Sequence, residues 1–178
     1  MRLVRGRRRK ARFETLTLVG QWREWDLERD NGDPEVRFQG WVFRDPETGT
    51  AIPYGDDGVE VAGAVVVRAA GVSYREDALQ EDAFRPGQPL ELTPEPWNPH
   101  DRNAVAIWDA AHRHQVGYVP RDLAPYIAGR FRRGDRLRAM CLAEFVHRSG
   151  KRCGLRVLIA PATLRLDLED SVQTGHHQ

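Results

Sequence analysis

Few cysteines and the absence of any long apolar run restrict the class of protein that this sequence can encode. The 178 residues include two cysteines, Cys141 and Cys153, which are too few for a disulfide framework in a chain of this size. They lie at unequal distances from the polar turn HRSGK, so we predict that both are reduced. No apolar run approaches the roughly 18 residues that cross a membrane, and the basic N-terminus lacks the apolar stretch of a secretory signal. We therefore expect a cytoplasmic protein with no membrane segment.

The motifs of several catalytic classes are missing as well. The chain has no G-x-S-x-G elbow of a serine hydrolase and no glycine-rich loop that would cradle phosphates. We therefore predict no catalytic residue, no cofactor and no metal, with two alternatives left open. A metal-dependent nuclease needs carboxylates near a lysine, for which Glu144 and Lys151 are a loose candidate pair. A zinc site at His112 and His114 would lack a cysteine or carboxylate at a standard spacing.

The net charge of +1 hides a strong segregation of charge along the chain. Residues 1–12 carry seven cations and no carboxylate, whereas residues 24–60 carry eleven carboxylates against three arginines. Residues 121–138 are basic again, with six arginines against two aspartates. Two basic segments favour a polyanionic partner, and the alternative is a solvated tail and a solvated helix face.

The periodicity of the sequence predicts a mainly β protein in four parts. We expect a disordered basic arm over residues 1–12, a β-rich extension over 13–58, a barrel over 59–166 and a flexible tail over 167–178. In the barrel part, short strands alternate with turns at intervals of about eight to twelve residues, and one helix is interposed. This pattern favours a small antiparallel barrel of the OB type with one or two helices.

The elements of the barrel can be placed by residue number. We expect strands over 61–75, 89–92, 104–108 and 115–119, a helix over about 123–131, and a hairpin of 137–146 with 153–159. The expected core includes five apolar residues: Leu92, Val105, Ile107, Val116 and Leu123. Trp97 and Trp108 are expected to pack against the barrel.

The groups that carry chemistry fall on the loops and strand ends of this barrel. They are Tyr74, Asn98, His100, Asp101, Tyr118 and Arg121. Aromatic faces, an amide, a carboxylate and a cation together are able to hold the end of a nucleic-acid strand. The alternative is that Asn98 to Asp101 form a simple turn, in which Asn98 and Asp101 hydrogen-bond to their own backbone.

Three segments of the chain together resemble the HIRAN domain. They read GVSYR, then PGQPLELTPEPWNPHDRNAVAIW, then QVGYVPRDLA, and they follow the order and short spacings of that family over about residues 63–160. The resemblance implies an OB-like module that recognises single-stranded DNA at its 3′ end. It implies further that the N-P-x-D loop, with Asn98 and Asp101, hydrogen-bonds the terminal 3′-hydroxyl.

The resemblance also implies roles for the other loop residues. Tyr74 is expected to contact the last phosphate or base, and His100 to stack under a base in place of the phenol often found there. Tyr118 occupies a position where the family often has a histidine, and Arg121 one where it has a phosphate-binding cation.

Ser73 departs from the best-known member of the family, which has an arginine at that position, so one phosphate contact is expected to be missing. Arg75 can replace this phosphate contact only if its side chain reaches the same face of the strand as Ser73. Adjacent residues of a strand normally point to opposite faces.

The sequence therefore predicts a non-catalytic binding module for free 3′ ends of single-stranded DNA, acting in DNA repair or replication-fork processing. Two rivals remain. In the first, the protein is an adaptor subunit whose acidic extension docks a helicase or nuclease while the barrel is a scaffold. In the second, the protein is a metal-dependent nuclease that acts on the same ends.

Deletion of residues 1–12 is expected to weaken binding to every DNA and to flatten its salt dependence. Each lost phosphate contact lowers the slope of log K against log salt by about 0.7 for a single strand. Titrations of the full-length and truncated chains at several salt concentrations measure the change. An unchanged slope would show that the seven cations of the arm do not contact DNA.

Overall fold

The computed structural model describes residues 15–22, 36–44, 51–52, 60–61 and 63–169. The expected basic arm lies outside the described residues, as do parts of the expected extension and residues 170–178 of the expected tail. None of the helices among the described residues has the length and apolar character to span a membrane.

The chain is mainly β, as predicted. The strands are β1 (Thr15–Trp22), β2 (Val36–Arg44), β3 (Ala51–Ile52), β4 (Glu60–Val61), β5 (Ala64–Arg68), β6 (Pro89–Pro94), β7 (Val105–Asp109), β8 (Gln115–Tyr118), β9 (Leu137–His147), β10 (Arg152–Pro161) and β11 (Arg165–Glu169). The helices are the short 3₁₀ turns η1 (Val72–Tyr74) and η2 (Asp82–Phe84), the single turn α1 (Glu76–Leu79), and α2 (Ala124–Arg132).

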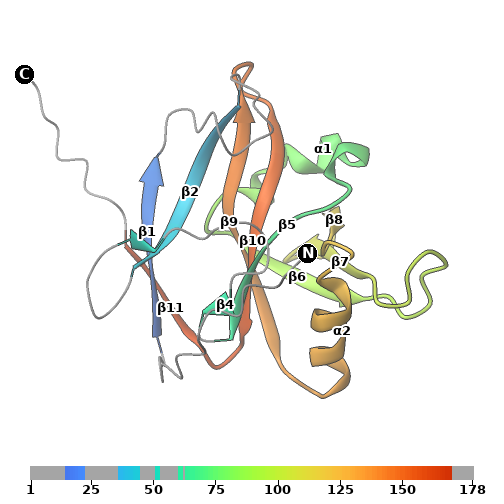
Figure 1. The fold of residues 1–178 in the computed structure, drawn as a ribbon. Helices are drawn as coiled ribbons and strands as arrows, with labels where there is room; N and C mark the ends of the chain where they lie inside the picture. Colours follow the sequence, from blue (N-terminus) through green and yellow to red (C-terminus); the bar gives the residue numbers. More distant parts are fainter. Residues whose placement is uncertain (1–14, 23–35, 45–50, 53–59, 62, 170–178) are drawn as a thin grey trace, which may run out of the picture.

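The strands form one curled sheet with an OB-like half-barrel at its centre (Figure 1). The main path runs β11-β1-β2-β9-β10-β5-β4, and a branch leads from β9 through β6 and β7 to β8. The pairings are antiparallel except for β1 with β11, which are parallel. An isolated bridge between Ala70 and Tyr118 joins the chain after β5 to β8. This bridge brings the two ends of the barrel sheet together.

The central strands are buried on both faces. Because side chains alternate across a strand, Val65 and Val67 of β5 enter the barrel core, while Ala64 and Val66 enter a second apolar cluster on the opposite face. Leu18 of β1, which is fully buried, belongs to that second cluster. The β1 strand of the expected extension therefore packs on the outer face of the barrel sheet.

Most expected elements of the barrel are confirmed. Strands β6, β7 and β8, helix α2 and the β9–β10 hairpin lie where the periodicity places them. Val105, Ile107 and Val116 are fully buried in the core, and Leu92 and Leu123 are partly buried against it. Both cysteines are thiols, as predicted: Cys153 is exposed, while Cys141 is buried and donates to Phe84 O at 3.1 Å. Burial raises the pKa of the Cys141 thiol.

Two expected backbone elements are wrong. The strand expected over 61–75 ends at Arg68, because Gly71 adopts the left-handed region at φ 73° and turns the chain into η1. Asp167 to Glu169, which were assigned to the expected tail, belong to β11 and pair with β1, and residues 170–178 lie outside the described residues.

Trp97 was expected to pack but is 74% exposed, because it lies in the loop between β6 and β7 beyond the edge of the barrel. Trp108 does pack, on the ring of His112.

Candidate nucleic-acid interface

The loop that joins β6 to β7 is held in shape by the two residues that the sequence selects. Asn98 Oδ1 accepts hydrogen bonds from the backbone N–H groups of His100 (2.9 Å) and Asp101 (3.3 Å). Asp101 Oδ1 in turn accepts from the backbone N–H of Asn103 at 2.8 Å. The alternative prediction, that Asn98 and Asp101 hydrogen-bond to the backbone of their own turn, is thus confirmed as one role of these residues.

Each of the two side chains keeps one unused polar group. An amide nitrogen has two hydrogens and a carboxylate has two oxygens. Asn98 Nδ2 donates one hydrogen bond, to Glu95 Oε2 at 2.9 Å, and has a second hydrogen to donate. No residue in the described part of the chain hydrogen-bonds to Asp101 Oδ2. The loop therefore offers one donor and one anionic acceptor three residues apart.

Glu95 connects this loop to the end of β8 and was missed by the sequence analysis. Its Oε2 accepts from Asn98 Nδ2 and from the hydroxyl of Tyr118, at 3.3 Å. The spacing of three residues to Asn98 is a weak local signal, but nothing in the sequence reports the contact to Tyr118, which is 23 positions away. Through Glu95, the structure brings Asn98, Asp101 and Tyr118 into one cluster.

Tyr74 and Arg75 lie on the neighbouring segment, beyond the Ala70–Tyr118 bridge. Tyr118 N–H donates to Ala70 O at 2.9 Å, and Ala70 N–H donates to Tyr118 O at 2.8 Å. The chain then turns at Gly71 into η1, which leaves Tyr74 91% exposed.

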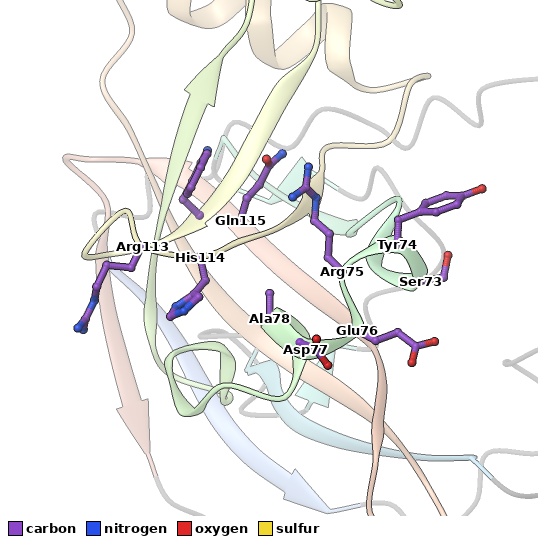
Figure 2. A pocket seen from close by; sticks show the side chains of 10 residues that line it. Ser73, Tyr74, Arg75, Glu76, Asp77, Ala78, Arg113, His114 and Gln115 are labelled. Carbon is purple, nitrogen blue, oxygen red and sulfur yellow. The ribbon is translucent and has the colours of Figure 1, made fainter.

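Ser73, Tyr74 and Arg75 line one pocket (Figure 2). The strand geometry that would point adjacent residues to opposite faces does not apply here, because these residues lie in and after a 3₁₀ turn.

The segment that follows η1 is fixed by Arg152, which is 8% exposed. Its guanidinium donates to the carbonyl oxygens at the end of α1, Leu79 (3.0 Å), Gln80 (3.1 Å) and Glu81 (2.8 Å). Arg152 Nε also lies 3.1 Å from Oε2 of Glu144, a carboxylate that is 4% exposed. A cation at the C-terminal end of a helix satisfies carbonyls that lack a helical partner. Arg152 thus ties the α1 region to the β9–β10 hairpin.

The residues suggested for the two metal alternatives are engaged elsewhere. Glu144 pairs with Arg152, whereas Lys151 hydrogen-bonds Glu76 at 2.6 Å, so the two residues of this candidate pair each contact another side chain. His112 Nδ1 lies 3.5 Å from Glu91, and His114 Nδ1 lies 3.1 Å from Asp109. Among the described residues no group of three histidines, cysteines or carboxylates is placed to hold a metal ion.

Two predicted site residues stand apart from these contacts. His100 is exposed on the β6–β7 loop, and Arg121 is exposed just before α2. The described residues form no hydrogen bond with either side chain. The predicted site residues therefore divide into a loop cluster, a pocket pair and two exposed side chains.

The chain is similar to several known proteins. The family model described as the HIRAN domain matches residues 62–160, which is more than half of the chain. Among solved structures, a protein from Lactobacillus plantarum matches at a TM-score of 0.42 and 23% identity, covering 53% of this chain and 89% of its own. The HIRAN domain of human HLTF matches at a TM-score of 0.43 and 16% identity, covering 55% and 73%. No curated protein matches significantly. The chain therefore belongs to the HIRAN domain family, a family of non-catalytic DNA-binding modules.

Proposed function

We propose that this protein binds single-stranded DNA and holds its free 3′-hydroxyl end at the β6–β7 loop. The observation that carries the proposal is the loop itself, in which Asn98 and Asp101 are fixed by backbone hydrogen bonds and each keeps one polar group for a ligand. In the cell, the cytoplasmic module would present DNA ends to a helicase or nuclease during repair or replication-fork processing.

A sugar hydroxyl is the chemical complement of this pair. A hydroxyl donates one hydrogen bond and accepts others, so its hydrogen can bond Asp101 Oδ2 while its oxygen accepts from Asn98 Nδ2. A 3′-phosphate would instead place negative charge beside the Asp101 carboxylate, and a strand that continues would need the same space. Asp101 thus selects against the wrong termini as well as binding the right one.

The surrounding residues supply contacts that do not depend on the terminus. Tyr74, at 91% exposure, offers its ring to the last base or phosphate, and His100 offers a second surface for stacking. Tyr118 orients the loop through its hydrogen bond to Glu95. Arg121, an exposed cation just before α2, would bind a phosphate.

The protein is expected to bind an oligonucleotide with a 3′-hydroxyl about tenfold more tightly than one with a 3′-phosphate, a difference of about 1.4 kcal/mol. Asp101→Asn should abolish most of this preference, because it removes the charge and keeps an oxygen for the Asn103 N–H. Fluorescence anisotropy with the two labelled oligonucleotides measures both affinities. Asp167→Asn, an exposed aspartate on β11, is the matched control. Equal affinity of the unmodified protein for the two termini would refute end recognition.

A further inference from the structure

A pocket of about 660 Å³ opens between residues 73–78 and the turn that joins β7 to β8 (Figure 2). Beyond η1 and α1, its lining consists of Trp108, Arg113, His114 and Gln115. His114 was considered above as a zinc ligand. The other three residues were not predicted to belong to any site. The pocket shares Tyr74 and Arg75 with the predicted DNA interface, so it continues that interface along β8.

The pocket presents more unpaired cations than unpaired carboxylates. Arg75 and Arg113 form no ion pair with any residue in the described ranges, and Figure 2 shows Arg75 extending toward Gln115. Glu76 extends away from the β7–β8 side and hydrogen-bonds Lys151 at 2.6 Å, which lowers the pKa of its carboxyl group. Asp77 is the carboxylate that remains in the lining.

His114 is oriented by a buried carboxylate. Asp109 is 2% exposed, and its Oδ2 lies 3.1 Å from His114 Nδ1. Burial disfavours the charged form of Asp109, but hydrogen bonds from the Arg113 N–H and the His114 ring outweigh it, so the pKa of Asp109 lies below its ordinary value. An ionised Asp109 holds a proton on Nδ1 of His114, so Nε2 donates to a phosphate oxygen only when the ring carries a proton on both nitrogens. The stack of Trp108 on His112, with ring centroids 4.1 Å apart, stiffens the same turn.

Arginine guanidinium groups and a histidine in a preformed, polar pocket match a phosphate group. Guanidinium groups bind phosphate oxygens with two parallel hydrogen bonds, and a fixed turn lowers the entropy that is lost on binding.

We propose that this pocket binds a backbone phosphate of a DNA strand whose 3′ end lies at the β6–β7 loop. Arg113 and His114, with Arg75, then form a phosphate subsite upstream of the terminus. This inference rests on the proposed function, because it assumes that the terminus is held at Asp101.

The position of the pocket agrees with a strand of a few nucleotides. Strand β8 carries Gln115 at the pocket and Tyr118 at the loop cluster. Three residues of a strand span about 10 Å. A single strand covers at least the roughly 3.4 Å per nucleotide of a duplex, and more when it is extended, so this distance corresponds to about two or three nucleotides. A dinucleotide held by its 3′-hydroxyl would therefore not reach the pocket, whereas a longer strand would.

Arg113→Gln in the full-length protein tests the subsite. It should lower the affinity for an oligonucleotide of about 12 nucleotides by about threefold to fivefold at low salt and reduce the magnitude of the salt slope by about 0.7. Affinity for a dinucleotide and the preference for a 3′-hydroxyl should not change. His114→Gln should act in the same direction. Arg165→Gln, an exposed arginine on β11, is the matched control and should leave all four quantities unchanged.

The outcomes separate this inference from the proposed function. If Arg113→Gln binds the long oligonucleotide as tightly as the unmodified protein, or loses equal affinity for the dinucleotide, the pocket is not an upstream subsite. If the length-dependent loss occurs in a protein that does not distinguish 3′ termini, the pocket binds phosphate but the end-recognition proposal is wrong.

Discussion

Arg152→Met is expected to lower the free energy of unfolding by about 3–5 kcal/mol, the usual range when one partner of a buried ion pair is removed. The substitution removes the guanidinium that pairs with the carboxylate of Glu144, which is 4% exposed. It also removes the donors to the carbonyl oxygens of Leu79, Gln80 and Glu81. Methionine keeps most of the side-chain volume, so the loss reports polar contacts rather than a cavity.

Denaturant unfolding followed by circular dichroism measures this loss. Arg165→Met, at an exposed position of β11, is the control and is expected to change stability by less than about 0.5 kcal/mol. The double variant Arg152→Met with Glu144→Leu should recover part of the stability, because the buried carboxylate is removed together with the cation that pairs with it. A loss below about 1 kcal/mol for Arg152→Met would mean that the hydrogen bonds and the ion pair of Arg152 contribute little to the stability of the fold.

Gly117→Ala is expected to destabilise the protein by about 1–3 kcal/mol and to weaken DNA binding together with stability. A Cβ atom at position 117 would lie 2.4 Å from Ala70 O, a distance that no relaxation of side chains can relieve because the neighbour is backbone. The chain at Ala70 would have to move away from β8. That movement would break the Ala70–Tyr118 bridge and displace Tyr74, four residues later.

Gly129→Ala is the matched control for this substitution. Gly129 lies in α2, and a Cβ there would meet only the ends of two arginine side chains, the nearer at 3.5 Å. Alanine is favoured over glycine in a helix by about 0.5–1 kcal/mol, so this variant should be as stable as the unmodified protein or more stable. If Gly117→Ala folds with unchanged stability and unchanged affinity for DNA, the close approach of β8 to Ala70 is not required for folding or for DNA binding.

The strands and the helix of the barrel could be predicted because their patterns are local. Val105 and Ile107 stand two positions apart in the short apolar run AVAIW, while Leu123, Ile127 and Phe131 recur at helical spacing after a proline. The end of β5 could not be predicted from a local pattern of this kind. Apolar residues continue past Arg68 to Val72, and the stop depends on the left-handed conformation of Gly71.

The sequence predicted which residues belong to the candidate site but not which of them contact one another. Asn98 and Asp101 were found because asparagine and aspartate in a proline-containing loop are a local signal. The contacts that link Glu95 to Tyr118 and Arg152 to Leu79 join residues 23 and 73 positions apart. No short-range pattern records such pairs. The pocket was missed for the same reason, since it forms only where the 73–78 segment meets the β7–β8 turn.

The parallel neighbour of β1 is synthesised long after β1 itself. Thr15 pairs with Arg165, so about 150 residues must be added before the pairing can begin. At about 5–20 residues per second, the ribosome needs roughly 8–30 seconds for that stretch. During this interval β2 can occupy one side of β1, while the other side exposes unsatisfied amides that could template association with a second nascent chain. Emergence of β11 from the exit tunnel would then close this edge of β1.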